Sequence, residues 1–335
     1  MSMGDGMAAS VGRPWLCVQQ RVARAAVVVV LRAGSMVGCV LQPRRLQADG
    51  RASRNMRQCG MSIHQPTTLN IDCMLAYELD GDCEFLFMVH PAEHRLQTLI
   101  DEELRLEPRV PHRLHVDVQS GNRVLRLRAG AGTLRLDYRA RVERRLEDDH
   151  SDAPELPISE LPDEVLRYLL PTRYCESDLL GAVARQTFGA LPGGHPRVQA
   201  ICDWVHRYIE YRIGSTDATT TARDVFLQRA GVCRDFAHLS IAFCRALNIP
   251  ARLVSGYARF DEPPPDFHAV FEAYLGGRWV LFDPTRMVPV DQLVRVAHGL
   301  DAKDVAFATI YGPARMTGMS PEVETVAAPP ARRAR

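Results

Sequence analysis

A cysteine at the start of a helical segment is the residue in this sequence whose type and position best suit chemistry. The apolar side chains that follow Cys233 recur at helical spacing and predict a buried helix over 233–247; they are Phe236, Leu239, Phe243 and Leu247. The free N–H groups and the dipole at a helix N-terminus favour an anion, so a thiolate at Cys233 would be stabilised there. A thiolate is the nucleophilic form of cysteine, and it requires a base and a group that orients this base.

Two downstream strands are predicted to supply the base and its partner. Two glycines at 276–277 lie between apolar runs and are typical of a two-residue hairpin turn. In that register Val270 faces Asp283, and His268 lies on the same strand face as Val270. His268 and Asp283 are then diagonal neighbours about 7–8 Å apart at the backbone, a gap that side chains bridge. We therefore predict that Asp283 accepts a hydrogen bond from one imidazole nitrogen while the other nitrogen faces the thiol.

Other reactive side chains near this segment have structural interpretations. Cys244 lies in the middle of the predicted helix beside the apolar stripe, where a thiol is packed. His238 follows Cys233 by five residues, but no second close ligand pair accompanies it, which favours a structural role over a metal site. Asp235 and Arg234 are assigned to the first helical turn and a local ion pair. Trp204 and Tyr211 fit either core positions or the wall of a cleft.

Three segments of the chain resemble the core motifs of the transglutaminase-like superfamily: GVCRDFAHL, DFHA and WVLFDPTR. Further similarity covers most of residues 61–315 and includes YLLPTRYCESD, the helix with WVHRYIEY, and AHGLDAKDVAFATIYG. The resemblance implies a papain-like fold with Cys233 as nucleophile, His268 as base and acid, and Asp283 as the group that orients the imidazole. The chain differs at 270–271, where relatives often place a tryptophan, which alters the acyl-binding cleft but leaves the triad intact.

The activity that this resemblance implies is thiol acyl transfer on peptide or protein substrates. The thiolate of Cys233 would attack a carboxamide and form a thioester, with its own backbone N–H as one oxyanion donor and a second donor unassigned. Water as acceptor makes a cysteine peptidase or amidase, and a primary amine makes a transglutaminase. Hydrolysis is preferred because water needs no second binding site. A non-catalytic peptide-binding module is the alternative of a different class, and the complete triad counts against it. No cofactor and no metal, calcium included, is expected.

The region before these motifs, 61–146, predicts an antiparallel β domain. Apolar and polar residues alternate along 69–78 and 134–142, and glycines near 121 and over 130–132 supply turns. Such alternation indicates a sheet with one buried and one charged face. No potentially catalytic side chains are concentrated in this region, so we expect it to support the site rather than form it.

The remainder of the chain predicts a linker, a catalytic domain and a tail. Residues 147–162 are acidic and contain three prolines, as is typical of a linker. Within the catalytic domain, placed at 163–315, helical patterns come first and β-type runs follow. Residues 316–335 are expected to be a disordered tail. The fold class is therefore α+β, with an N-terminal antiparallel β domain followed by a papain-like α+β core.

The net charge of +1 is the sum of two unlike parts. Residues 1–60 hold nine arginines against Asp5 and Asp49, a net charge of +7, and the rest of the chain holds 32 basic and 38 acidic groups, a net charge of −6. A mildly acidic body argues against a nucleic-acid partner. We expect 1–60 to be a disordered extension or to precede a true start at Met61, in preference to a signal or lipoprotein peptide, and expect the folded body not to bind membranes.

Nine cysteines occur without any C-x-x-C pair. An odd number with this spacing fits neither a disulfide framework nor a zinc knuckle. Reduced thiols in a cytoplasm are the simplest interpretation, and one of these thiols is expected to be reactive.

Overall fold

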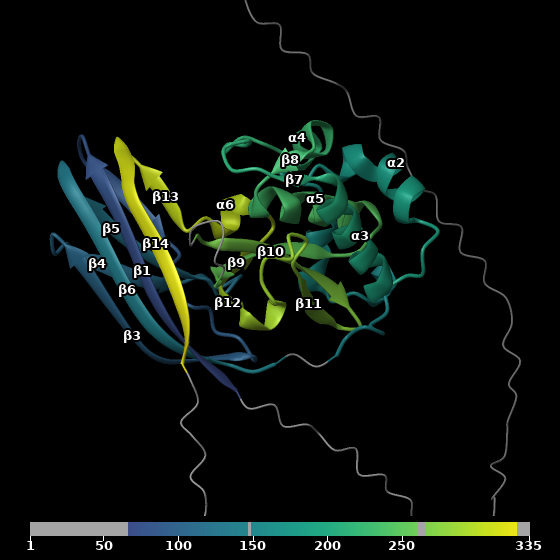
Figure 1. The fold of residues 1–335 in the computed structure, drawn as a ribbon, viewed down its shortest axis with the longest axis horizontal. Helices are drawn as coiled ribbons and strands as arrows, with labels where there is room; N and C mark the ends of the chain where they lie inside the picture. Colours follow the sequence, from purple (N-terminus) through teal and green to yellow (C-terminus); the bar gives the residue numbers. More distant parts are fainter. Residues whose placement is uncertain (1–65, 147–148, 260–265, 327–335) are drawn as a thin grey trace, which may run out of the picture. The chain divides into compact units, whose positions relative to one another are not determined.

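The structure is a computed structural model that describes residues 66–146, 149–259 and 266–326 (Figure 1). All of these residues belong to one compact unit within 61–335. No helix in this described part of the chain is long and apolar enough to cross a membrane. The predictions for residues 1–60, including a start at Met61, fall outside the described residues.

Two four-stranded antiparallel sheets form a sandwich. The first contains, in spatial order, β14 (Ala314–Val326), β1 (Thr67–Leu79), β6 (Gly132–Arg144) and β3 (Gln97–Glu107). The second contains β13 (Ala308–Tyr311), β2 (Cys83–Phe87), β5 (Arg123–Ala129) and β4 (His112–Val116). Alternate residues of β1 are buried, and the ring of Tyr77 lies 5.4 Å from that of Phe85 in the facing sheet. The alternation in the sequence thus produces the expected antiparallel sheets.

The C-terminal segment corrects the predicted tail. Residues 316–326 belong to β14, which pairs along β1, with Val323 opposite Ile71, so the expectation of disorder there is wrong. Gly318 and Pro321 interrupt the alternation that would have revealed a strand, and an edge strand tolerates proline. The sandwich is therefore built from both ends of the described chain, and the boundary at residue 146 omits two of its strands. Residues 327–335 lie outside the described part.

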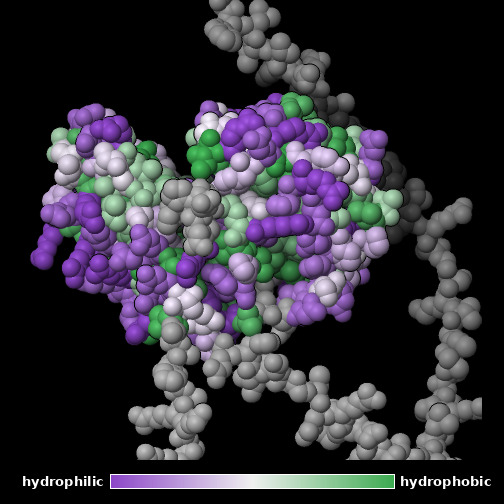
Figure 2. Space-filling model, viewed as in Figure 1, coloured by the Kyte–Doolittle hydropathy of each residue, from purple (hydrophilic) through white to green (hydrophobic). Residues whose placement is uncertain are grey.

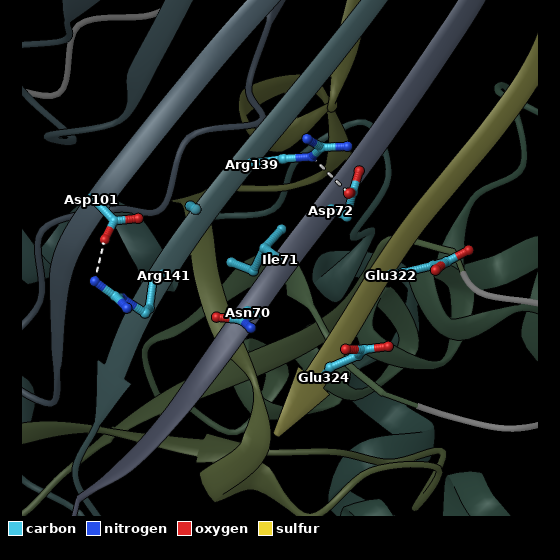
Figure 3. Close-up of a pocket in the computed structure, with 9 residues that line it drawn as sticks. Asn70, Ile71, Asp72, Asp101, Arg139, Arg141, Glu322 and Glu324 are labelled. Carbon is cyan, nitrogen blue, oxygen red and sulfur yellow. Dashed lines mark hydrogen bonds and ion pairs between the residues drawn. The ribbon is translucent and has the colours of Figure 1, made fainter. Parts of the chain in front are cut away.

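The outer face of the first sheet carries paired charges. Arg139 on β6 bonds to Asp72 on β1 at 2.8 Å, and Arg141 bonds to Asp101 on β3 at 2.6 Å (Figure 3). These side chains line a hollow of about 420 Å³, drawn in Figure 3. Hydrophilic residues cover much of the sandwich on the side of the molecule that Figure 2 shows. Exposed ion pairs of this kind each contribute about 0–1 kcal/mol. The face is a solvated, charged surface.

The α+β core lies between β6 and β13 in the sequence. Its helices are α1 (Asp163–Leu166), α2 (Ser177–Phe188), α3 (His195–Tyr208), α4 (Ala222–Gln228), α5 (Cys233–Ala246) and α6 (Ala302–Val305). Its antiparallel sheet has the order β11 (Arg278–Phe282), β10 (His268–Leu275), β9 (Ala251–Tyr257) and β12 (Val294–Gly299). Two short strands, β7 (Glu210–Tyr211) and β8 (Ala230–Gly231), pair in parallel. The α+β class predicted for the chain is confirmed.

Helix α5 is the central element of the core. Every residue from 235 to 245 is buried, and the helix packs against β10 (Figure 1). Three residues of the predicted apolar stripe, Phe236, Leu239 and Phe243, are buried in this packing. The fourth, Leu247, is half-buried and lies just beyond the end of the helix at Ala246. A helix that is enclosed on all sides is held rigidly by its neighbours, so the residue at its start has a fixed position.

The predicted linker packs against the core. Leu161 is buried in a cluster with Tyr274, and Glu155 accepts hydrogen bonds from Arg197 at 2.9 Å and from the backbone of Gly194 at 2.9 Å. The acidic and apolar residues of this proline-rich segment therefore find partners on the core surface. Residues 149–162 form part of the folded unit, whereas 147–148 lie outside the described residues.

Candidate active site

Cys233 is the first residue of α5, as the sequence predicts. The residue before it, Val232, is extended, and its backbone N–H donates to Asp235 Oδ2 at 2.9 Å. Thr216 donates to the same oxygen at 2.6 Å, so a loop from before α4 is tied to the start of α5. These bonds fix the first turn and leave Cys233 half-buried, whereas the other described cysteines are buried. The nucleophile candidate is thus the one described thiol that a substrate can reach.

His268 is the first residue of β10 and lies where the predicted hairpin register places it. Tyr274 pairs with Trp279, and Phe271 pairs with Phe282, which continues to Asp283 just beyond the end of β11. The imidazole Nε2 lies 2.9 Å from Asp283 Oδ2, and the two side chains are 1% and 4% exposed. The predicted contact between histidine and aspartate is therefore present.

Asp283 is oriented by bonds of its own. Its Oδ1 accepts hydrogen bonds from the backbone N–H of Thr285 at 2.9 Å and from the Thr285 hydroxyl at 2.7 Å. Burial acts to raise the pKa of this carboxyl, but the hydrogen bonds from His268 and Thr285 outweigh burial and hold the pKa below its ordinary value. Asp283 is consequently a carboxylate with one oxygen directed at His268.

The charge of His268 follows from its two partners. Burial disfavours the imidazolium, but the bonds with Asp283 and with the side chain of Cys233 outweigh it and raise the pKa of His268 to about 10. Since Nε2 is engaged by Asp283, Nδ1 is the nitrogen that faces Cys233. The Sγ of Cys233 lies 4.0 Å from the carbonyl oxygen of Phe267, the residue before His268. The structure therefore brings Cys233, His268 and Asp283 together from one helix start and two strands.

The other reactive side chains of this segment, Cys244 and His238, lie elsewhere in the core. Cys244 is completely buried, and burial raises the pKa of its thiol far above the ordinary value. His238 is also buried, and its Nε2 accepts a hydrogen bond from the backbone N–H of Ala302 at 3.1 Å. Burial, with Arg234 and Arg245 nearby, lowers the pKa of His238 to about 3. Both residues occupy the structural positions expected of them.

Tyr211 is the site residue that sequence reasoning leaves undecided. Its pattern fits either the core or a cleft wall, and the structure places its half-buried ring against Phe236 in the first turn of α5, with ring centroids 5.8 Å apart. A two-residue strand, β7, sets this position by pairing with β8 just before α5. A strand of two residues has no detectable periodicity, so the sequence pattern could not reveal the contact.

Comparison with known proteins agrees with this arrangement. A solved structure from Cytophaga hutchinsonii, described as that of a candidate cysteine protease, is 39% identical to this chain, with a TM-score of 0.75 over 79% of this chain and 93% of that protein. The model of the transglutaminase-like superfamily matches residues 182–284, a range that contains all three triad positions. The chain belongs to this superfamily.

Curated relatives of this superfamily member cover less of the molecule. An uncharacterized protein of Mycobacterium leprae is 33% identical over 155 residues, which are 43% of this chain and 53% of that protein. An uncharacterized protein of Mycobacterium tuberculosis is 37% identical over 127 residues, 33% of this chain and 40% of that protein. The chain thus spans about half the length, or less, of the curated relatives it matches.

Proposed function

We propose that this transglutaminase-like protein is a thiol enzyme that attacks amide bonds of peptides or proteins and acts as a cysteine peptidase or amidase. The observation that carries the proposal is the buried pair of His268 and Asp283 beside Cys233 at the start of α5. The Cytophaga hutchinsonii relative, described as a candidate cysteine protease, supports the same class of reaction.

The reaction begins with the thiolate of Cys233 and the imidazolium of His268. The sulfur attacks the carbonyl carbon, and the carbonyl oxygen becomes an oxyanion that accepts a hydrogen bond from the backbone N–H of Cys233. His268 gives its proton to the leaving amine as the carbon–nitrogen bond breaks, which leaves a thioester on Cys233. His268 then takes a proton from water, the hydroxide displaces the sulfur, and the free acid leaves. Asp283 holds the imidazole in position throughout.

The first experiment separates an enzyme from a binding module. We expect iodoacetamide to alkylate Cys233 at neutral pH much faster than Cys244, as measured by peptide mass spectrometry. Because Cys233 is also more exposed than Cys244, the decisive comparison is His268→Asn, which removes the proton partner but leaves the thiol accessible. We expect alkylation to slow by about tenfold or more in His268→Asn. An unchanged rate would favour a peptide-binding module.

The second experiment separates hydrolysis from amine transfer. A glutamine-containing peptide is offered with and without a labelled primary amine, and products are identified by mass spectrometry. Lys303 is the sole lysine of the sequence, so Lys303→Arg removes the lysine acceptor that the enzyme itself would offer. We expect cleavage or release of ammonia without label incorporation. Incorporation that depends on Cys233 would instead identify a transglutaminase, the acceptor alternative.

The cytoplasm is the compartment that we propose for this enzyme. The six cysteines in the described part of the chain are free thiols, and a reduced nucleophile is what the proposed chemistry requires. Fractionation of the native host, with N-terminal sequencing of the protein, tests this. Recovery of a processed form outside the cytoplasm would overturn it.

A further inference from the structure

We propose that Phe307 is a positioning residue that holds His268 in place beside Cys233. Its ring stacks on Phe267, the residue that precedes His268, and its backbone is bonded to the β sandwich. The assignment rests on the proposed thiol function and gives the sandwich a part in it. The three rings of Tyr257, Phe267 and Phe307 are called the aromatic cluster below.

Phe267 is linked to both residues on which the first step of the proposed reaction depends. It directly precedes His268, which is the first residue of β10. Its carbonyl oxygen lies 4.0 Å from Sγ of Cys233. A displacement of Phe267 would therefore change the distance between the imidazole and the thiol. A shift of about 1 Å in a reacting group can slow a reaction about a hundredfold.

The end of β10 that carries His268 has a partner on only one side among the described strands. Strand β9 pairs with β10 from His268 onward, whereas β11 pairs with it only from Phe271 to Leu275. The first three residues of β10 therefore lack the second row of hydrogen bonds that holds the rest of the strand. Besides the bond of His268 to Asp283, contacts of the aromatic cluster restrict the movement of this end.

The ring of Phe267 packs against the two other rings of the aromatic cluster. The ring of Phe307 is nearly parallel to it, with centroids 4.7 Å apart and an interplanar angle of 4°. The ring of Tyr257 lies 5.1 Å away, at an angle of 38°. Phe267 and Tyr257 are buried, and Phe307 is half-buried. Because buried rings are closely packed, the position of the Phe267 ring depends on where the other two rings are fixed.

Phe307 and Tyr257 are both anchored at two adjacent residues of the sandwich that follow β2. Phe307 lies between α6 and β13, where the chain passes from the core into the sandwich (Figure 1). Its carbonyl accepts a hydrogen bond from the N–H of Met88 at 3.0 Å. The hydroxyl of Tyr257 donates to the carbonyl of Val89 at 2.6 Å. The aromatic cluster therefore ties the position of Phe267 to one segment of the sandwich.

Phe307 is the member of the aromatic cluster that can be truncated with the least damage to the core. Tyr257 is completely buried, and its truncation would leave the buried carbonyl of Val89 without this donor. Phe307 is half-buried, and its bond to Met88 uses only backbone atoms, which a substitution by alanine retains. A variant at Phe307 therefore removes the stacking on Phe267 but keeps the bond to the sandwich.

The test compares Phe307→Ala with Phe226→Ala, a matched control in α4. Phe226 is also half-buried and also stacks on another ring, that of Trp204, with centroids 6.0 Å apart and an interplanar angle of 15°. We expect Phe307→Ala to lower kcat on a peptide amide by about 10–100-fold, with KM changed by less than about twofold. Alkylation of Cys233 by iodoacetamide, which needs no substrate, should be about tenfold slower at pH 7, and its pH profile should move to higher pH. Phe226→Ala should match the wild type in these measurements, and Phe307→Tyr, which keeps the ring, should restore kcat.

Several results would overturn the assignment. One is a folded Phe307→Ala variant with the kcat and the alkylation profile of the wild type. Another is an equal loss of activity in Phe226→Ala, because activity would then follow stability, which urea titration of each variant measures. A fall in kcat with an unchanged alkylation profile would show that Phe307 acts on the substrate instead of on His268. If Phe307→Ala does not fold, Phe307→Leu keeps the apolar bulk without the ring, and a wild-type kcat in that variant counts against the stacking.

Failure of the positioning role can be distinguished from failure of the proposed function. A wild type that neither cleaves a peptide amide nor shows alkylation dependent on His268 would refute the thiol function as a whole. A wild type that does both, with Phe307 variants that behave identically to it, would refute the positioning role alone.

Discussion

At the residue scale, the charge of the proposed base depends on a few short contacts. His268 is almost completely buried, an environment that by itself favours the neutral imidazole. The carboxylate of Asp283 and the sulfur of Cys233 reverse this preference and raise the pKa of His268 to about 10. An imidazolium at neutral pH is the state of His268 that the proposed mechanism requires, because it supplies the proton for the leaving amine.

Replacing Asp283 by Asn tests this dependence. The amide keeps the size of the side chain but removes the negative charge, so the pKa of His268 should fall toward its ordinary value. We expect the alkylation of Cys233 at pH 7 to slow by about tenfold to a hundredfold. The alkylation rate is measured by mass spectrometry across a series of pH values. Asp203→Asn is the matched control, because Asp203 is exposed and bonds to Arg286 at 2.5 Å. An equal effect of both variants would contradict the prediction.

The same pKa predicts how stability depends on pH. The pKa of His268 is raised from 6.5 to about 10 in the folded protein, so its contribution is complete below about pH 6.5 and is lost as pH rises through about 10. The difference in free energy of unfolding between the wild type and His268→Asn should therefore shrink from pH 6 to pH 10.5. Urea titrations at three pH values measure it. A constant difference would show that His268 is not charged in the folded state.

At the scale of elements, strand β10 carries a second buried charge on the face of His268. Glu272 is four residues beyond His268 and is 1% exposed, and it pairs with Arg252 on β9 at 2.7 Å and with Arg295 on β12 at 3.1 Å. Burial opposes its ionisation, but the two arginines outweigh burial and lower the pKa of Glu272 to about 2. One carboxylate thus ties three strands of the core sheet together and fixes the strand that presents His268.

Glu272→Gln should be strongly destabilising because it removes the counter-charge of the buried Arg295 and of the half-buried Arg252. We expect a loss of about 3–5 kcal/mol in the free energy of unfolding, measured by urea denaturation at pH 7. Glu103→Gln, at an exposed pair with Arg105, should change it by less than about 1 kcal/mol. The lowered pKa also means that the contribution of Glu272 is complete above about pH 4.5 and is lost as pH falls toward 2. Equal losses in the free energy of unfolding for Glu272→Gln and Glu103→Gln would refute the predicted difference.

The elements differ in how far the sequence could predict them, and the reason is physical. The two-glycine turn at 276–277 imposes one register on β10 and β11, so the contact of His268 with Asp283 follows from the sequence alone. Strand β14 and the pairing of β7 with β8 cannot be predicted in this way, because their hydrogen-bond partners are remote in the sequence. In addition, the alternation along β14 is interrupted, and β7 and β8 are too short to show any. The contact of His268 with Asp283 is therefore predictable from local rules, whereas the position of Tyr211 beside the first turn of α5 emerges only from the tertiary structure.

At the scale of the whole molecule, the sandwich and the core are joined by buried hydrogen bonds. The Tyr257 hydroxyl on β9 donates to the carbonyl of Val89 at 2.6 Å. The Gln97 amide donates to the carbonyl of Arg295 at 2.9 Å and accepts from the N–H of Arg295 at 3.0 Å. Arg295 is the residue that also holds Glu272. Since buried groups without partners cost about 1–3 kcal/mol each, the two parts should unfold together.

A charge placed in β14 tests this coupling from within the sandwich. Val323 is buried opposite Ile71, so Val323→Asp should cost about 2 kcal/mol or more, whereas the exposed neighbour variant Glu322→Gln should be nearly neutral. The described tryptophans, Trp204 and Trp279, both lie in the core, so their fluorescence in a Trp15→Phe background reports the core alone. We expect the urea midpoint of this fluorescence to fall together with that of circular dichroism. A fluorescence midpoint that stays at the wild-type value while the dichroism midpoint falls would show that the core is stable without an intact sandwich.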